Sequence, residues 1–385
     1  MKPFSPLLFI VLCFTQLAYA DPENEFGDGV PDTEWDALFS RTEGWSGGDV
    51  AGTIPLADGR TVWVFGDSWI GNVAEGKHVG GSHLVNNAIG VHSPSTLGNE
   101  RAPRYSDLTF YWGNATVDEK PTAWVRPLEH ADTQWFWASG GGAVVPSADG
   151  MSDRLVVFLF HITKTSETDD SVWNFQGIGE AMAIVDNPNK PAGDWSPRTV
   201  LIPRKQGQKP ISWGVSAHVR EIEKKSFLYV YGVLKVDDWN KQLFVARVPA
   251  TNFEKIEHWT YFADNDGWSE SSTEAAPIAN GVTSELSVHP RNGKYYLIQS
   301  EPLFGHHIML RTATSPEGKW SEPKAVYKVP GLDRGDYFTY AAKGHPHLSG
   351  ANDLLVTYIV NAHDFWSMAA DASIYRPRFI RVPLK

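Results

Sequence analysis

Three carboxylates at the ends of predicted strands have the types and spacing to do chemistry together. In the stretch GGDVAGTIPLADGRTVWVFGDSW, residues 47–69, Asp49 precedes an alternating strand and Asp67 follows an apolar one. A turn signal at residues 57–59 folds the chain back, so we expect Asp49 and Asp67 to lie opposite each other. Like charges in that position destabilise a ladder, and they raise the pKa of at least one carboxyl group.

Glu285 is the third carboxylate, at the start of the predicted hairpin SELSVHPRNGKYYLIQSE, residues 284–301. The pair Asn292-Gly293 predicts a type I′ turn, which would set Glu285 opposite Ser300. Glycoside hydrolases use two carboxyl groups that face each other across a gap, and a third carboxylate can shift the pKa of one of them.

The same hairpin pattern recurs along the chain and predicts the fold. Copies occupy residues 47–69, 140–161, 213–232, 284–301 and 344–361, and further β-prone segments follow several of them. Four strands per unit and five units predict an all-β, five-bladed β-propeller with four-stranded blades around a central channel. We expect residues 21–385 to form this single domain, with a short helix at 33–39 and the segment near 33–41 closing the ring. A β-sandwich with long insertions is the competing fold.

In a propeller, the starts of the first strands and the ends of the second strands gather at one face. This places further acids, histidines and amides near the three carboxylates, together with tryptophans on which sugar rings could stack. Other tryptophans, Trp195, Trp259 and Trp320, recur at equivalent positions and are expected to pack between blades. The candidate substrate contacts are Trp45, Trp69, Asn87, His161, His218, Glu301, His345, Asn361 and Arg376.

Composition limits the class of protein. Residues 1–20 have the charged start, apolar core and small-residue cleavage site of a secretory signal peptide, so we expect a secreted or periplasmic protein. The single cysteine, Cys13, lies in that segment, which excludes disulfides and thiolate sites from the mature chain. A net charge of −11 argues against nucleic acid as a partner. We expect a monomer without a membrane span or cofactor; a cation held by His345, His347 and His218 is the alternative.

The chain resembles a family of secreted bacterial propellers that was long labelled as a domain of unknown function. The resemblance rests on GWSGGDVAGTIPLADGRTVWVFGDSWIG, VNNAIGVHS, VYGV, VARVP, SELSV and IYRPRFIRV, in this order along the chain. It implies kinship with endo-acting arabinan hydrolases, in which an Asp of the first blade is base or nucleophile and a Glu across the channel is the acid. Asp49 and Glu285 would take these roles, with Asp67 as the tuning or alternative nucleophilic carboxylate.

One departure separates this chain from the better-known arabinanases and invertases, which carry the tuning Asp on the second blade and the acid on the third. Here the second blade begins with Gly140-Gly141-Gly142 and the third offers His218. The leading hypothesis is a hydrolase of an arabinan-like or other furanose-containing polysaccharide. The rivals are a non-catalytic carbohydrate-binding propeller and a polysaccharide lyase that uses His218 as its base.

Overall fold

The computed structural model describes residues 25–93, 107–115, 120–147, 149–150, 152–166, 174–203, 207–237, 240–264 and 267–385. The predicted signal peptide at residues 1–20, with Cys13, lies outside them. The described chain is nearly all β, and its α-helices are α1 (Thr33–Leu38) and α2 (Ser367–Ala370). No helix within these residues is long and apolar enough to cross a bilayer.

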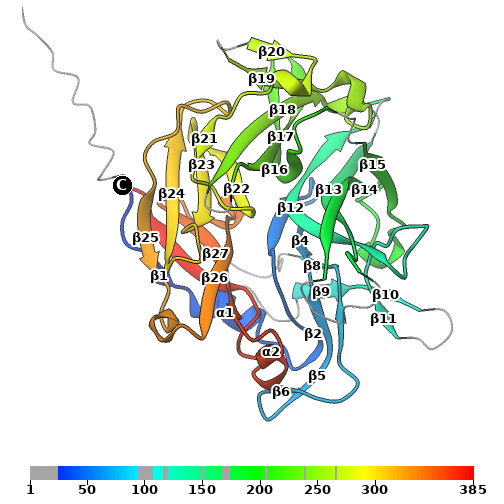
Figure 1. Cartoon of the computed structure of the whole chain (residues 1–385), viewed down its shortest axis with the longest axis vertical. Helices are drawn as coiled ribbons and strands as arrows, with labels where there is room; N and C mark the ends of the chain where they lie inside the picture. Colours follow the sequence, from blue (N-terminus) through cyan, green and yellow to red (C-terminus); the bar gives the residue numbers. More distant parts are fainter. Residues whose placement is uncertain are drawn as a thin grey trace, which may run out of the picture.

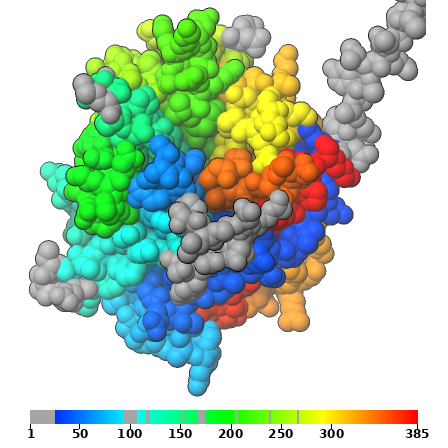
Figure 2. Space-filling model, turned by 180° about the vertical axis from the view of Figure 1, so that it is seen from behind, coloured from blue at the N-terminus to red at the C-terminus, as the bar shows by residue number. Residues whose placement is uncertain are grey.

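The described residues form seven antiparallel sheets, and five of them follow one another along the chain around a common centre (Figure 1). Seen from behind, the segments again succeed one another around the molecule (Figure 2). The first two sheets contain β3 (Gly52–Pro55), β4 (Thr61–Phe65), β8 (Ala88–His92) and β9 (Leu108–Tyr111), then β12 (Gln134–Pro146), β13 (Asp153–Thr163), β14 (Gln176–Val185) and β15 (Arg198–Ile202).

The third sheet is larger than the others, with six strands. It contains β16 (Ser212–Ile222), β17 (Lys225–Lys235), β18 (Lys241–Pro249), β19 (Thr260–Ala263), β20 (Gly267–Ser269) and β21 (Ala279–Asn280). The fourth contains β22 (Leu286–Arg291), β23 (Lys294–Ser300), β24 (His307–Ala313) and β25 (Lys324–Lys328). The fifth contains β26 (Tyr337–Gly344), β27 (Asp353–Ala362), β28 (Arg378–Pro383) and, from the N-terminal end of the described chain, β1 (Val30–Pro31).

The N-terminal segment completes the fifth sheet, but slightly earlier in the chain than expected. Val30 and Pro31 pair with β28, while the predicted helix follows them as α1. Asp32 begins this helix because its carboxylate accepts the Trp35 amide at 3.2 Å. Trp35 then packs on Phe379 with ring centroids 5.4 Å apart, which fixes the helix to the fifth sheet.

The apolar core is divided into five clusters, each between two neighbouring sheets, including one between the fifth sheet and the first. Strand β17 shows why its sequence is apolar throughout. Leu228 and Val230 pack toward the second sheet, whereas Tyr229 and Tyr231 pack toward the fourth. Alternate side chains of a strand point to opposite faces, so a strand buried on both sides needs apolar residues at every position.

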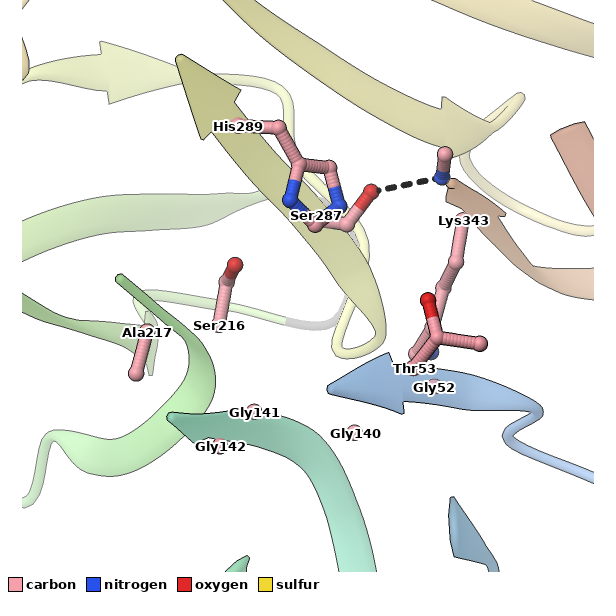
Figure 3. Close-up of a pocket in the computed structure, with 11 residues that line it drawn as sticks. Gly52, Thr53, Gly140, Gly141, Gly142, Ser216, Ala217, Ser287, His289 and Lys343 are labelled. Atoms are coloured by element: carbon pink, nitrogen blue, oxygen red, sulfur yellow. Dashed lines mark hydrogen bonds between the residues drawn. The ribbon is translucent and has the colours of Figure 1, made fainter. Parts of the chain in front are cut away.

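The first strands of all five sheets line a small central cavity of about 10 Å3 (Figure 3). Glycines of β12 allow the close approach: a Cβ on Gly141 would lie 2.1 Å from the Gly214 carbonyl oxygen, and one on Gly142 would lie 2.2 Å from Ile54 Cδ1. The Gly140-Gly141-Gly142 run is therefore required by packing around the centre. The Gly344 amide donates to Ser287 Oγ at 2.9 Å between the fifth and fourth sheets.

A β-bulge interrupts the pairing of three of these first strands with their second strands. Left-handed backbone marks it at Gly140 (φ 95°), Gly214 (φ 98°) and Ala341 (φ 55°). In the first sheet Val50 (φ 68°) and Ala51 (φ 49°) have the same conformation. The first hairpin continues past these residues into a separate four-stranded sheet of β2 (Glu43–Gly48), β5 (Ser68–Ala74), β6 (Lys77–His78) and β7 (His83–Val85). The seventh sheet of the described residues is the pair β10 (Gly113–Asn114) and β11 (Pro121–Thr122).

Candidate active site

Asp49 and Asp67 lie together at one end of the first hairpin. The Asp49 amide donates to the Asp67 carbonyl oxygen at 3.3 Å, and the Gly66 amide donates to the Asp49 carbonyl oxygen at 3.4 Å. Gly66 gives the Asp49 side chain its space, since a Cβ there would lie 2.4 Å from Asp49 Oδ1. Val50, directly after Asp49, is a β-branched residue in the left-handed region, which is a rare and strained conformation.

Asp67 accepts two side-chain hydrogen bonds. Trp137 Nε1 donates to Asp67 Oδ1 at 2.6 Å, and Asn86 Nδ2 donates to the same oxygen at 3.3 Å. Burial raises the pKa of Asp67 to about 6, and the two hydrogen bonds limit the rise. Because an indole N–H has no lone pair to offer, the Trp137 contact favours the ionised carboxylate.

Asp49 is in a more unfavourable place for a charge. Burial raises the pKa of Asp49 well above its usual range, and the negative charges of Glu285 and Asp67 raise it further. Tyr340 donates to Asp49 Oδ2 at 2.9 Å and Tyr375 also lies close, and both hydroxyls act in the opposite direction on this pKa. Oδ1 is buried without a hydrogen-bond partner. Of the two aspartates, Asp49 therefore has the environment that favours the protonated form more strongly.

Glu285 is tied to a lysine from the fifth sheet. Lys343 Nζ lies 3.2 Å from Glu285 Oε2, and the lysine side chain is only 1% exposed. Gly140 makes this possible, because a Cβ there would lie 2.3 Å from Lys343 Cε. The hairpin that carries Glu285 forms as predicted: Asn292 (φ 50°) and Gly293 (φ 77°) make the turn, and Leu286 pairs with Gln299.

A cavity of about 230 Å3 opens beside Glu285, between the second and third sheets. Lys241 Nζ donates to Ser284 Oγ at 2.7 Å at its edge, next to Glu285. Its walls are mixed, with apolar side chains, two lysines, a glutamate and glycines; its lining is Phe160, Ile162, Gly177, Gly179, Glu180, Pro210, Ser212, Val233, Lys235, Lys241 and Ser284.

The two tryptophans predicted as sugar contacts pack inside the molecule. Trp45 is 1% exposed and stacks on Phe110 with ring centroids 4.4 Å apart. Trp69 is buried and stacks on His78 at 4.6 Å. Both side chains belong to the core between the first and fifth sheets, so neither presents a face to a ligand.

Asn87 and His345 are also structural. The Asn87 amide donates to the carbonyl oxygens of Val125 and Phe136, each at 2.9 Å, and links segments before and within the second sheet. Both ring nitrogens of His345 are engaged, with Thr53 Oγ1 at 2.7 Å and Thr357 Oγ1 at 2.9 Å. The described residues contain no group of three or more His, Cys, Asp or Glu side chains placed to hold a metal ion, so the cation alternative has no ligand set there.

His218 does not face the carboxylates. Its ring stacks on Tyr229 at 5.4 Å and on Tyr231 at 5.7 Å, between the third and fourth sheets. Burial lowers the pKa of His218 to about 3, and neither ring nitrogen has a hydrogen-bond partner. The strand alternation explains this, since Ala217 lines the centre and its neighbour points away.

The remaining predicted contacts differ in their distance from the site. Asn361 reaches it, with Nδ2 3.5 Å from the Tyr340 hydroxyl. Glu301 instead accepts a hydrogen bond from the His307 amide in the loop that follows it. His161 Nε2 lies 2.9 Å from Gln134 Oε1, within hydrogen-bond distance. Arg376 is half-buried near Asp36 of α1 and Asp371, which favours the structural role over a substrate clamp.

The comparisons with known proteins agree with this architecture. A family model described as "Domain of unknown function (DUF5005)" matches residues 32–383. The chain belongs to this family. A search of curated proteins found no match to the sequence.

Solved structures resemble this DUF5005 chain over most of its length. A "putative hydrolase" from Bacteroides ovatus ATCC 8483 is 21% identical with a TM-score of 0.67, covering 91% of this chain and 89% of that one. An α-L-arabinofuranosidase from Podospora anserina is 15% identical with a TM-score of 0.47, covering 93% and 96%. A Bacillus subtilis levansucrase mutant is 12% identical with a TM-score of 0.48, covering 94% and 88%. The Bacteroides structure establishes the shared fold.

The sequence did not point to Tyr340, Lys343 or Asn86, nor to the hydrogen bond from Trp137 to Asp67. For Tyr340 and Lys343, the reason is that the first strand of the fifth sheet begins earlier than expected. The pattern predicts that the fifth copy starts at residue 344, whereas β26 of this DUF5005 domain begins at Tyr337. The first strand is instead the short segment FTYAAKG, which precedes GHPHLSG. Its alternation of aromatic and small residues is the signal that could have found Tyr340.

Proposed function

We propose that this chain is a secreted five-bladed β-propeller that hydrolyses glycosidic bonds of a polysaccharide, with an arabinan-like or other furanose-containing glycan as substrate. The five sheets, the five clusters between them and the shared central cavity support the propeller. One observation carries the activity: two half-buried carboxylates with raised pKa values, Asp49 and Asp67, meet at the end of one hairpin beside a third.

The two environments suggest a division of labour that differs from the one implied by the resemblance. Asp49, which holds a proton, donates it to the leaving glycosidic oxygen as general acid. Asp67, which is ionised above about pH 6, attacks the anomeric carbon or deprotonates the attacking water. Glu285 touches neither reacting atom in this scheme. Its negative charge, held in place by Lys343, keeps the proton on Asp49.

The cavity beside Glu285 is a natural place for one sugar of the bound chain. It is lined by apolar side chains together with serine, lysine and glutamate side chains, a mixture that can hold the apolar faces and the hydroxyl groups of a sugar. Lys241 and Ser284 bind each other at its edge, and Ser284 directly precedes Glu285 in the chain. The lyase alternative lacks a base, because His218 is buried between tyrosine rings.

The test is a panel of plant, algal and mycobacterial polysaccharides incubated with the purified mature chain and with Asp49→Asn, Asp67→Asn and Glu285→Gln. Asp58→Asn is the matched control, since Asp58 lies at the other end of the same hairpin and pairs with Arg60. We expect the first two substitutions to lower kcat/KM at least about a hundredfold. Glu285→Gln should keep measurable activity. The alkaline limb of its pH profile should move to lower pH, because the negative charge of Glu285 no longer raises the pKa of Asp49.

Each alternative gives a different result. Binding without products from any glycan would favour the carbohydrate-binding propeller, and unsaturated products would favour a lyase. An inactive Glu285→Gln variant beside an active Asp67→Asn variant would restore Glu285 as the acid and remove the proposed role of Asp67.

A further inference from the structure

The turn between β23 and β24 has an unusual backbone. Leu303 (φ 60°) and Phe304 (φ 56°) are both in the left-handed region. Bulky side chains avoid this conformation, and two in succession persist only where the surroundings hold them. Strain of this kind collects at functional positions, so the turn is a candidate for a role in binding.

Glu301 holds the turn in this conformation. Its Oε2 accepts the His306 amide at 2.9 Å, the His307 amide at 3.1 Å and His307 Nδ1 at 2.7 Å. Gly305 leaves the room that the glutamate needs, because a Cβ there would lie 2.3 Å from Glu301 Cγ. Glu301 is thus a positioning residue for the turn.

The turn presents apolar side chains to solvent. Leu303 is 60% exposed and Phe304 is 58% exposed. One side of the Phe304 ring leans on Phe338, with ring centroids 4.6 Å apart, and on His363 at 6.3 Å. Burial of these two side chains in the folded chain therefore does not account for the strained backbone that carries them.

Phe304 is the outer end of an aromatic row that leads to the carboxylates. Phe338 contacts Tyr340 with centroids 5.5 Å apart, and the Tyr340 hydroxyl binds Asp49 Oδ2 at 2.9 Å. Phe338 is only 7% exposed, so Phe304 is the ring of this row that a ligand extended outward from Asp49 would contact. The row carries no charge, which suits the C–H faces of neutral sugar rings.

We propose that Leu303 and Phe304 form a distal platform for a neutral sugar ring of the same glycan chain that is held at Asp49 and Asp67. This inference rests on the proposed function, because it takes the carboxylates as the point of cleavage. Two side chains are far too small an area for a stable protein–protein interface. Continuity with the carboxylates favours a glycan as occupant.

The test combines binding with activity. Native gels cast with arabinan, arabinogalactan, xylan or levan measure retardation of the mature chain and of Phe304→Ala, Phe304→Trp and Phe304→Gly. Leu201→Ala is the control, since Leu201 is a comparably exposed apolar residue (55%) on β15. We expect Phe304→Ala to weaken binding about two- to tenfold, while Phe304→Trp keeps it. On oligosaccharides of increasing length, Phe304→Ala should have a lower kcat/KM than the wild type only for the long ones.

Phe304→Gly separates a ligand contact from packing. Glycine adopts the left-handed conformation without strain, so this variant should lose binding without a lower unfolding temperature. Normal binding by Phe304→Ala and Phe304→Gly, or lost binding accompanied by a lower unfolding temperature, would overturn the platform and leave hydrolysis standing. Binding that depends on Phe304 without any products would support the platform and refute the hydrolysis. A wild-type chain that neither binds nor cleaves any of the glycans would overturn both.

Discussion

Asp67 should make the protein less stable at neutral pH than at acid pH. Its pKa rises from 3.8 when exposed to about 6 in the folded chain. The folded state therefore binds more protons than the unfolded state between these pH values, and the free energy of unfolding falls as pH rises through that window. The loss amounts to about 3 kcal/mol above pH 6, from the stated rise in the pKa of Asp67.

Asp67→Asn removes this penalty and keeps the acceptor oxygen that Trp137 and Asn86 use. We expect the variant to gain stability over the wild type as pH rises from 4.5 to 8. At pH 8 the gain should approach about 3 kcal/mol, or a Tm about 4 °C higher for a chain of this size. The assay is thermal or urea unfolding of both proteins at intervals across this range.

Asp58→Asn supplies a control of opposite sign. Hydrogen bonds from Arg60 lower the pKa of Asp58, so this carboxylate contributes stability at neutral pH that is lost as pH falls through its folded-state pKa. The variant should be the less stable protein at pH 7 and equal to the wild type in acid. A difference between Asp67→Asn and wild type that stays constant with pH, or that grows toward acid pH, would refute the environment assigned to Asp67.

Two further predictions concern the partners of the carboxylates. Lys343→Met leaves Glu285 unpaired and should lower the free energy of unfolding by about 3 kcal/mol, measured in urea. The double variant Lys343→Met, Glu285→Gln should recover most of this loss. Equal stability of the single and double variants would argue against the ion pair. Tyr340→Phe removes a hydrogen bond that lowers the pKa of Asp49, so the alkaline limb of the pH–rate profile should move to higher pH, and a move to lower pH would contradict this.

Local features that rest on a few neighbouring residues could be predicted from the sequence. The Asn292-Gly293 turn fixes the register of β22 and β23, and the residues that flank it place Glu285 at the strand start. Asp49 and Asp67 were expected together because a single turn at residues 57–59 joins their strands. Short-range turn chemistry and strand alternation are sufficient for such statements.

Contacts between sheets could not be predicted in this way. Lys343 reaches Glu285 only because Gly140, on a different sheet and distant in the chain, leaves out a side chain. Tyr340 of the fifth sheet binds Asp49 of the first hairpin directly before a bulge in β26, and Trp45 lies in the core because Phe39 and Phe110 pack on its ring.

The sequence by itself determined the nearly all-β class, the hairpin repeats and the clustering of the three acids near one end of their strands. The tertiary structure alone decided which acid lies beside two further carboxylates, which accepts N–H donors and which is paired with a lysine. The physical reason is that a pKa depends on the charges and dipoles within a few ångströms, whatever their position in the chain. In a ring of sheets, those neighbours come from other strands, 58 residues away for Lys343 and Glu285 and 291 residues away for Tyr340 and Asp49.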